Sequence, residues 1–341
     1  NALADNTYMS YIRDHYDFAR PGNSNFLQRL LGRDRTYPVE PIHIPDSTEL
    51  NQAFQQYVED VRAGRTPAAA ELKFDGGRLM VQGVQGVMTI NGILAKWIFE
   101  RNKEKHAFYV EESYVIAWMY PYLRPSGIIM KIEKEPLPSP QQAPEVWKEI
   151  VARDRAYWDK LTAEFLARPD FLRNSDAKKS FSKLRSAIAG VYAARSMIDE
   201  AEYAFRQSRE LCPESPEANF RLADLYMQLH RFSDARVLIE DYLKVDEYNG
   251  SAKNMLDMVK GAEQADARRM ELEKLEKDGR MDLRSALELL AVYQRLNMEP
   301  QFMGMAGNFM ASSNMPADVF ATLAQMLGSA RKWDLAGAAM R

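Results

Sequence analysis

The sequence contains one cysteine, Cys212, in 341 residues. A single cysteine can form neither an internal disulfide nor a multi-cysteine zinc site, so no link of either kind stabilises the chain. Net charge is also scarce, because 45 Lys and Arg residues against 48 Asp and Glu residues give a formal charge of -3. Without an overall basic field to attract phosphate backbones, nucleic acid is not expected as a partner.

Long apolar runs are absent as well. The nearest candidate for a membrane helix, Gly86 to Phe99, contains Asn91 and Lys96 and falls short of the roughly 18–20 apolar residues that a span needs. We therefore expect this chain to be soluble as it stands. It begins with Asn1 and Ala2, without an initiator Met or a basic-then-apolar leader, which favours an expressed fragment of a longer protein.

The sequence does have enough apolar material for a core, since 46% of its residues are hydrophobic and 11% are aromatic. This composition is typical of a folded globular protein. Because single domains usually contain about 100–200 residues, a chain of 341 residues is expected to form two domains.

The second half of the chain carries an internal repeat with a period of 34 residues. Residues 182–215 and 216–249 superpose without a gap. The matching pairs are Ile188 and Leu222, Ala189 and Ala223, Tyr192 and Tyr226, and Ala201 and Ala235. Two of these pairs are alanines, and small residues are expected where two helices cross closely. Each unit is therefore predicted to be a hairpin of two helices.

In the first unit, Phe205 and Pro213 complete a pattern that resembles the tetratricopeptide repeat, in which Tyr, Ala, an aromatic residue and Pro recur at fixed positions. The second unit departs from that pattern, with Ile239 in place of the aromatic residue and Glu247 in place of the proline. The resemblance implies an all-α superhelix of stacked hairpins whose usual role is to hold another protein.

Further units are expected after these two. Tyr293 and Leu327 are again 34 residues apart, which predicts weaker units at 283–316 and 317–341. The intervening segment, 250–282, is one residue short and highly charged, and it predicts a degenerate unit in the form of a long exposed helix ending at Gly279. Because the chain stops at Arg341 inside an apparent second helix, either the array is truncated or it is capped by packing on another surface.

The first half mixes helical and extended periodicity, which predicts an α/β or α+β domain over residues 3–138. The expected elements are a helix from Asp5, a helix that starts at a capping box over 46–49 and ends at Gly64, a hairpin of 72–74 and 79–81, a helix over 87–102, and strands at 108–112 and 128–132. Residues 139–144 have the composition of a proline-rich linker, so the helical domain is predicted to cover 145–341.

Several segments of the first half resemble the soluble tail of uncharacterised bacterial polytopic membrane proteins, which are related to glycosyltransferases that use lipid-linked sugars. The segments are 3–11, 108–113, 118–123 and 127–131. This resemblance implies that membrane helices precede this chain, that the chain lies on the extracytoplasmic side of a bacterial membrane, and that the catalytic acid lies in the membrane half. Otherwise a cytoplasmic location is expected.

No convergent set of reactive residues is evident. The histidines, His15, His43, His106 and His230, lack the spacing of metal ligands, so no metal and no cofactor is expected. Adjacent residues of a strand point to opposite faces, so Glu111 and Glu112 are not a paired acid and base. Asp5 and Asn6 are possible ligand-binding residues at a helix start, although helix capping is the simpler interpretation. The aromatic residues at 118–122 are more typical of a core than of a ligand platform.

In a repeat array, the first helix of each unit lines the inner face. For the second unit this places Phe220, Asp224, Met227 and Gln228 as candidate partner-binding residues. The first unit lacks the Lys and Asn with which chaperone-binding repeats hold a C-terminal carboxylate, so a chaperone tail is not the expected partner.

The sequence thus favours a non-catalytic protein-interaction or scaffold module that forms the soluble C-terminal portion of a larger, membrane-anchored protein. The alternative is that the α/β half is itself a sugar- or nucleotide-handling transferase or ligand-binding domain, with the repeats selecting its substrate.

Overall fold

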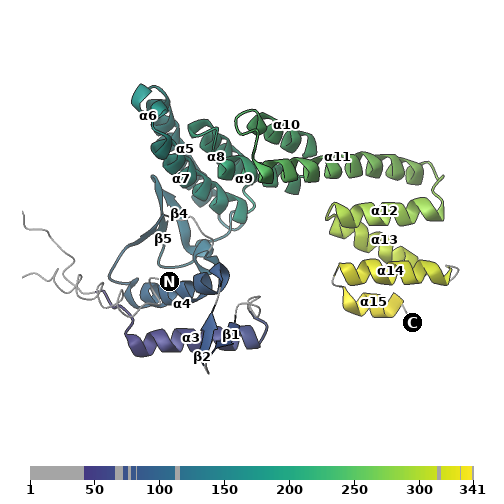
Figure 1. Cartoon of the computed structure of the whole chain (residues 1–341), viewed down its shortest axis with the longest axis horizontal. Helices are drawn as coiled ribbons and strands as arrows, with labels where there is room; N and C mark the ends of the chain where they lie inside the picture. The colour runs from purple at the N-terminus through teal and green to yellow at the C-terminus, as the bar shows by residue number, and fades with distance from the viewer. Residues whose placement is uncertain are drawn as a thin grey trace, which may run out of the picture. The chain divides into compact units, whose positions relative to one another are not determined.

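The computed structural model describes residues 42–65, 72–75, 78–81, 83–111, 116–312, 316–330 and 332–339. It is mostly helical, with short strands in the N-terminal part (Figure 1). The chain divides into two compact units, Asn1–Ala204 and Phe205–Arg341. The helix predicted from Asp5 lies outside the described residues.

In the first unit, α3 (Ser47–Arg62) packs against α4 (Val84–Asn102). The capping box predicted at the start of α3 is present: the Asp46 side chain accepts hydrogen bonds from the backbone N–H groups of Thr48 and Glu49, and Glu49 accepts one from the backbone of Asp46. The two helices bury an apolar stripe made of Leu50, Ala53, Tyr57, Val58 and Val61 from α3 and of Ile90 and Leu94 from α4. This pairing gives the N-terminal part a core of its own.

The strands form two separate antiparallel groups. The predicted hairpin is present as β1 (Leu72–Asp75) paired with β2 (Arg78–Val81). The second group has three strands in the order β3-β5-β4, with β3 at Phe108–Val110, β4 at Leu123–Ser126 and β5 at Ile129–Ile132. Helices combined with a small sheet are consistent with the predicted mixed class, and the antiparallel pairing favours its α+β form.

The aromatic segment before β4 packs against α4, and its side chains are mostly partly buried. It forms a 3-10 helix, η3 (Ala117–Tyr122), and the rings of Trp118 and Tyr122 lie 5.4 and 5.6 Å from the ring of Phe99. The Trp118 indole donates a hydrogen bond to the carbonyl of Gly92 over 2.9 Å. Sequence patterning missed β4, because Pro125 is a residue that strands normally exclude except at edges, and β4 is an edge strand.

Three helices follow in the same unit: α5 (Pro144–Leu166), α6 (Pro169–Arg173) and α7 (Ser175–Ala194). Both α5 and α7 contact the three-stranded sheet. The Trp147 indole of α5 donates to the carbonyl of Pro138 over 2.8 Å, and the guanidinium of Arg195 lies 4.4 Å from the ring of Trp147 while donating to the carbonyls of Tyr120 and Pro121. These contacts hold Pro138, just before the proline-rich segment, and η3 against the helices. The predicted domain limits at 138 and 145 stay a prediction, but the structure groups α5 to α7 with the sheet.

The second unit continues the array of hairpins. After α8 (Ile198–Leu211), which ends before Pro213 as predicted, α9 (Pro216–Gln228) and α10 (Phe232–Leu243) form an antiparallel pair. Its interior contains Leu222, Ala223 and Tyr226 from α9 and Ala235, Leu238 and Ile239 from α10, all buried. The two alanines are fully buried, consistent with close packing of the two helices.

The turns repeat with the register that the sequence predicts. A backbone N–H closes each hairpin onto the carbonyl of the same repeat position: Met197 onto Tyr192, Arg231 onto Tyr226, Met298 onto Tyr293 and Lys332 onto Leu327. In three of these turns a residue other than glycine has a positive φ, at Ser196, His230 and Asn297. The same turn therefore recurs beyond residue 249, in helices α12 to α15.

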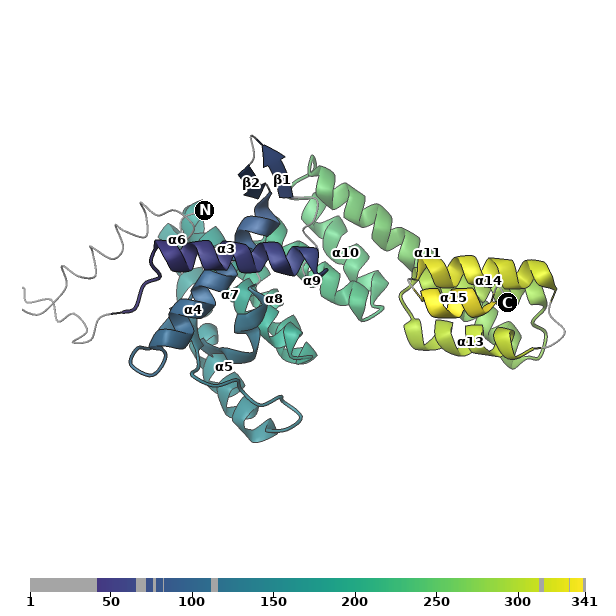
Figure 2. The same cartoon turned by 90° about the horizontal axis from the view of Figure 1, so that it is seen from below.

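The charged segment forms one helix, α11 (Gly250–Lys277), which ends at Gly279 with a φ of +64°. The predicted long helix is present and many of its residues are exposed, but it also packs along one side. The first part of α11 packs against α10 (Figure 2), and its last part packs against α12 (Leu283–Arg295). Ala252, Val259, Ala265 and Leu272 lie buried along it at spacings of six or seven residues. Charge dominated the composition of the segment and hid this narrow apolar line.

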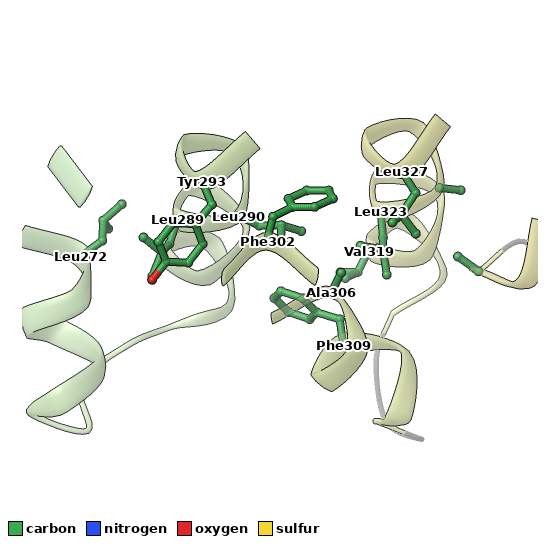
Figure 3. Packing of buried hydrophobic residues seen from close by; sticks show 12 residues of the cluster. Leu272, Leu289, Leu290, Tyr293, Phe302, Ala306, Phe309, Val319, Leu323 and Leu327 are labelled. Carbon is green, nitrogen blue, oxygen red and sulfur yellow. The ribbon is translucent and has the colours of Figure 1, made fainter. Parts of the chain in front are cut away.

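The last helices stack on α12 in the order α13 (Glu299–Ala311), α14 (Ala317–Ser329) and α15 (Trp333–Ala339). Their shared core is drawn in Figure 3, where Leu289, Leu290 and Tyr293 of α12 meet Phe302 of α13. Val319, Leu323 and Leu327 of α14 continue the same core. The methionines of this region, such as Met303, Met305 and Met310, pack against it as partly buried residues, which agrees with ordinary packing between helices.

Candidate functional site

The predicted partner-binding residues lie on α9, which its neighbours hold firmly. Ser215 caps the start of the helix by accepting from the backbone N–H of Ala218, and Pro216 occupies the first turn. The buried side of α9 packs on α10, and the Tyr226 hydroxyl accepts hydrogen bonds from the Arg206 guanidinium at 3.1 and 3.2 Å. Because these contacts hold α9 in place, the side of α9 that faces away from them also has a fixed orientation relative to α10.

The four predicted residues do not form one free surface. The Phe220 ring packs edge to face on the Tyr242 ring at 5.7 Å, and is partly buried. Met227 packs into a small core of Phe232, Ala265 and Leu296. Asp224 and Gln228 are exposed. Whether any of the four contacts a partner stays a prediction, but the structure gives Met227 a packing role that explains its residue type without a partner.

Asp224 lies one helical turn after Arg221 on α9. Partial burial raises the pKa of its carboxyl above the ordinary value, and Arg221 opposes that rise. Arg221 itself pairs with Glu217 at 2.9 Å. In the part of the chain that the structure describes, no ion pair reaches Asp224. A carboxylate in this position is less stable when ionised than one in open water.

The neighbouring helix α11 adds residues that sequence reasoning missed. α9 contacts α11, and Met258 occupies the position 34 residues after Asp224, as Asn254 does after Phe220. Met258 is 65% exposed, which is unusual for a large apolar side chain. The same 34-residue offset that revealed the repeat would have found both residues. We call the set Phe220, Asp224, Gln228, Asn254 and Met258 the inner strip.

Other predicted residues are placed as follows. Asp5, Asn6, His15 and Glu112 lie outside the described residues. His43 lies beside Glu49 and Arg101, and His230 occupies a repeat turn, as predicted. Across the described ranges, no group of three His, Cys, Asp or Glu side chains is arranged to hold a metal ion. Within the same ranges, no helix combines the length and the apolar character of a bilayer span.

A buried charge cluster between α5 and α7 was also missed. One carboxylate oxygen of Asp154 accepts from the Arg185 guanidinium at 2.7 Å and from the Tyr192 hydroxyl at 2.9 Å. Both side chains of the ion pair are 1% exposed, and the guanidinium lies 5.1 Å from the ring of Trp158. Burial and the adjacent Asp154 raise the pKa of Tyr192, so this phenol stays protonated. Asp154 interrupts the apolar face of α5. A carboxylate at that position in the sequence could have indicated a buried ion pair.

A concavity of about 420 Å³ lies beside α4 in the first unit. Its walls include the rings of Trp97 and Trp118, with Lys96 and Gln56 at polar positions. Across the described residues, Lys96 takes part in no ion pair. The volume falls within the range of roughly 300–1,000 Å³ that small-molecule sites occupy.

Comparison with known proteins supports the repeat. Residues 192–249 match the tetratricopeptide repeat family, and this segment contains the end of α7 together with α8, α9 and α10. Among solved structures, the chain is similar to a tetratricopeptide repeat protein from Parabacteroides merdae ATCC 43184. The two are 14% identical, and the match covers 59% of this chain and 88% of that chain with a TM-score of 0.25. At that score the likeness carries no argument about the fold.

No curated protein matches this chain. The family match confirms the predicted tetratricopeptide character for residues 192–249. The resemblance of the first half to membrane proteins of the glycosyltransferase type has no support in these comparisons and stays a prediction.

Proposed function

We propose that this chain is a non-catalytic protein-interaction module that holds a partner protein on the inner strip. The match of residues 192–249 to the tetratricopeptide repeat carries this proposal, because such arrays present extended surfaces built from the first helix of each hairpin. Two side chains on the adjacent helices α9 and α11 add to it. In the described residues the Asp224 carboxylate has no ion-pair partner, and the apolar Met258 side chain is exposed.

The test is partner retention by purified protein. The chain is used to capture proteins from an extract of its source cells, and each captured protein is then purified and titrated against wild type, Asp224→Lys and Asp257→Lys. Asp257 is an exposed carboxylate on α11 next to Met258 in the sequence, so it controls for the charge change. We expect Asp224→Lys to weaken binding at least about tenfold, which is the effect of a strong interface residue, and Asp257→Lys to leave it unchanged. Equal binding by all three proteins contradicts the proposal.

We further propose that the chain is the soluble portion of a larger bacterial protein and lies on the extracytoplasmic side of the membrane. Its support is the resemblance of residues 3–11, 108–113, 118–123 and 127–131 to the tails of such membrane proteins. The parent reading frame upstream of Leu3 tests this. About ten apolar segments of roughly 20 residues each are expected, and a start codon within a few residues contradicts the proposal.

A second candidate function is ligand binding in the concavity beside α4, and its size and its two tryptophans favour that possibility. Titration of nucleotide sugars and sugar phosphates against Trp97→Ala, monitored by the fluorescence of the remaining tryptophans, tests it. Saturable binding by wild type that is lost in Trp97→Ala supports a ligand site. Turnover of any such donor would contradict the non-catalytic proposal.

A further inference from the structure

We infer that the inner strip binds a basic segment of the partner, in which a Lys or Arg side chain pairs with Asp224 while its aliphatic stem lies on Met258 and Phe220. This inference rests on the proposed function, because it specifies the chemistry of the partner at the same surface. Its first support is charge. The inner positions of α9 carry Glu217, Phe220, Asp224, Met227 and Gln228, and no cation.

Neighbouring charges leave the Asp224 carboxylate unbalanced. Arg221 is engaged by Glu217, Arg231 by Asp234, and Arg236 by Glu240 and Glu263. On α11, Lys260 lies 3.7 Å from Glu240, and the Lys253 ammonium lies 5.7 Å from the centre of the Tyr248 ring. The cations on the helices around the strip thus have other partners. None of them forms an ion pair with Asp224 in the described residues, so the carboxylate is open to a cation from outside.

The cost of covering Asp224 also favours a cationic partner. The carboxylate is exposed in the free protein, so a partner that covers it removes hydration that has to be replaced. A partner with a purely apolar helix would bury Asp224 further without pairing it, which is costly, and an acidic partner would add repulsion. A cationic side chain is the occupant that offsets both effects.

The apolar part of the strip suits a long basic side chain. Met258 is 65% exposed and flexible, and Phe220 is held in place by its contact with Tyr242. Lys and Arg cover apolar surface with their methylene stems while placing the charged head elsewhere. Because first helices of successive repeats lie side by side, a stem that follows the line from Met258 to Asp224 meets an apolar contact and then a carboxylate.

The experiment selects peptides from a random peptide library displayed on phage, using the full chain as bait. The selected peptides are synthesised and titrated by fluorescence anisotropy against wild type, Asp224→Asn, Met258→Ala and the control Asp257→Asn. We expect the peptides to share a Lys or Arg next to an apolar residue. Asp224→Asn should weaken binding at least about tenfold, Met258→Ala severalfold, and Asp257→Asn not at all. Wild-type binding should also weaken as salt is raised.

Thermal unfolding of the free variants separates a binding role from a folding role. Since Asp224 is exposed and takes part in no ion pair in the described residues, Asp224→Asn should leave the Tm nearly unchanged while binding falls. A lowered Tm together with lost binding overturns the inference in favour of a structural role. Peptides without basic residues that still depend on Asp224 and Met258 overturn the inference but keep the proposed function. Failure to select any peptide that depends on these residues overturns both.

Discussion

Asp154 and Arg185 form a buried ion pair in the first unit, and losing one partner of such a pair is costly. We expect Asp154→Ala to lower the free energy of unfolding by about 3–5 kcal/mol, because it leaves the Arg185 guanidinium buried without its counter-charge. Hydrogen exchange in α5 and α7 under increasing denaturant measures the loss. Glu149→Ala is the control, since it breaks an exposed pair with Arg153 on the same helix and should cost less than about 1 kcal/mol.

A double variant identifies the cause of that loss. Replacing both charges, with Asp154→Leu and Arg185→Met together, removes the unpaired ion and should recover much of the stability. A double variant as unstable as Asp154→Ala would show that lost packing, rather than an uncompensated charge, dominates.

Two buried tyrosines of the second unit predict sensitivity to high pH. Burial, followed by a hydrogen bond to Asp246, raises the pKa of Tyr242 to about 12, and burial with a hydrogen bond to Glu273 does the same for Tyr293. An unfolded tyrosine has a pKa of about 10, so the folded state holds these protons more tightly. Their contribution to stability is complete below pH 10 and is lost as the pH rises towards 12.

Alkaline unfolding of wild type and Tyr293→Phe measures this effect. The variant has no hydroxyl to titrate, so its stability should fall less steeply between pH 10 and pH 12 than that of wild type. Tyr109→Phe is the control for removal of a tyrosine hydroxyl at an exposed position, since Tyr109 is 52% exposed. Parallel curves for Tyr293→Phe and wild type would contradict the prediction.

At the scale of single residues, the sequence predicted which helix a residue lies on better than which neighbours it contacts. The 34-residue register placed Asp224 and Gln228 on the first helix of the unit, where both are exposed. It could not show that Met227 packs against Phe232 or that Phe220 packs against Tyr242. Those contacts depend on how the second helix of the hairpin and α11 approach α9. Local patterning holds no information about such distant neighbours.

Among the elements, those with strong local signals were predicted well. The capping box before α3 and the glycine after α11 fix helix ends through hydrogen bonds between near neighbours, and both ends are where they were expected. The β4 strand was missed because its four residues include Pro125, and its pairing with β5 comes from a turn at Gly127, which has a φ of +68°. A short strand gains its stability from its partner rather than from its own sequence.

Exposed glycines give a prediction for α13. A Cβ at Gly304 or at Gly307 would have no neighbour within 4 Å, and both residues lie inside the helix. Each change to alanine should therefore raise stability by up to about 1 kcal/mol through helix propensity. Gly279→Ala is the contrast. It also meets nothing within 4 Å, but its φ of +64° should make the change cost about 1–2 kcal/mol.

Thermal and chemical unfolding of the three single variants measures this. The two α13 variants and the Gly279 variant should shift the Tm in opposite directions. A loss of stability in Gly304→Ala or Gly307→Ala would show that the exposed side of α13 is covered by another surface.

At the scale of the whole molecule, the helices of the second unit are joined mainly through neighbours. Successive contacts run from α9 to α10, α11, α12, α13 and α14, as in a linear array. Leu290 is fully buried in the core shared by α12, α13 and α14. Leu290→Ala should lower the local stability by about 2–5 kcal/mol.

Because stability in such an array is approximately local, the loss should be confined. Hydrogen exchange should accelerate in α12, α13 and α14, while α9 and α10 keep most of their protection. Val237→Ala is the control, as Val237 is 48% exposed on α10 and its truncation should fall within about 0.5 kcal/mol of wild type. Uniform acceleration across the unit would instead indicate that it unfolds as one cooperative block.

The recurrent hairpin turn also provides a route to engineering. Ser196, His230 and Asn297 each have a left-handed backbone conformation, which glycine adopts without steric cost. Substitutions at these positions can therefore change the stability of the hairpin turns. None of the three belongs to the inner strip, but His230 follows Gln228 by only two residues. A library restricted to Ser196 and Asn297 could therefore change the stability of the array without replacing residues at or beside the inner strip.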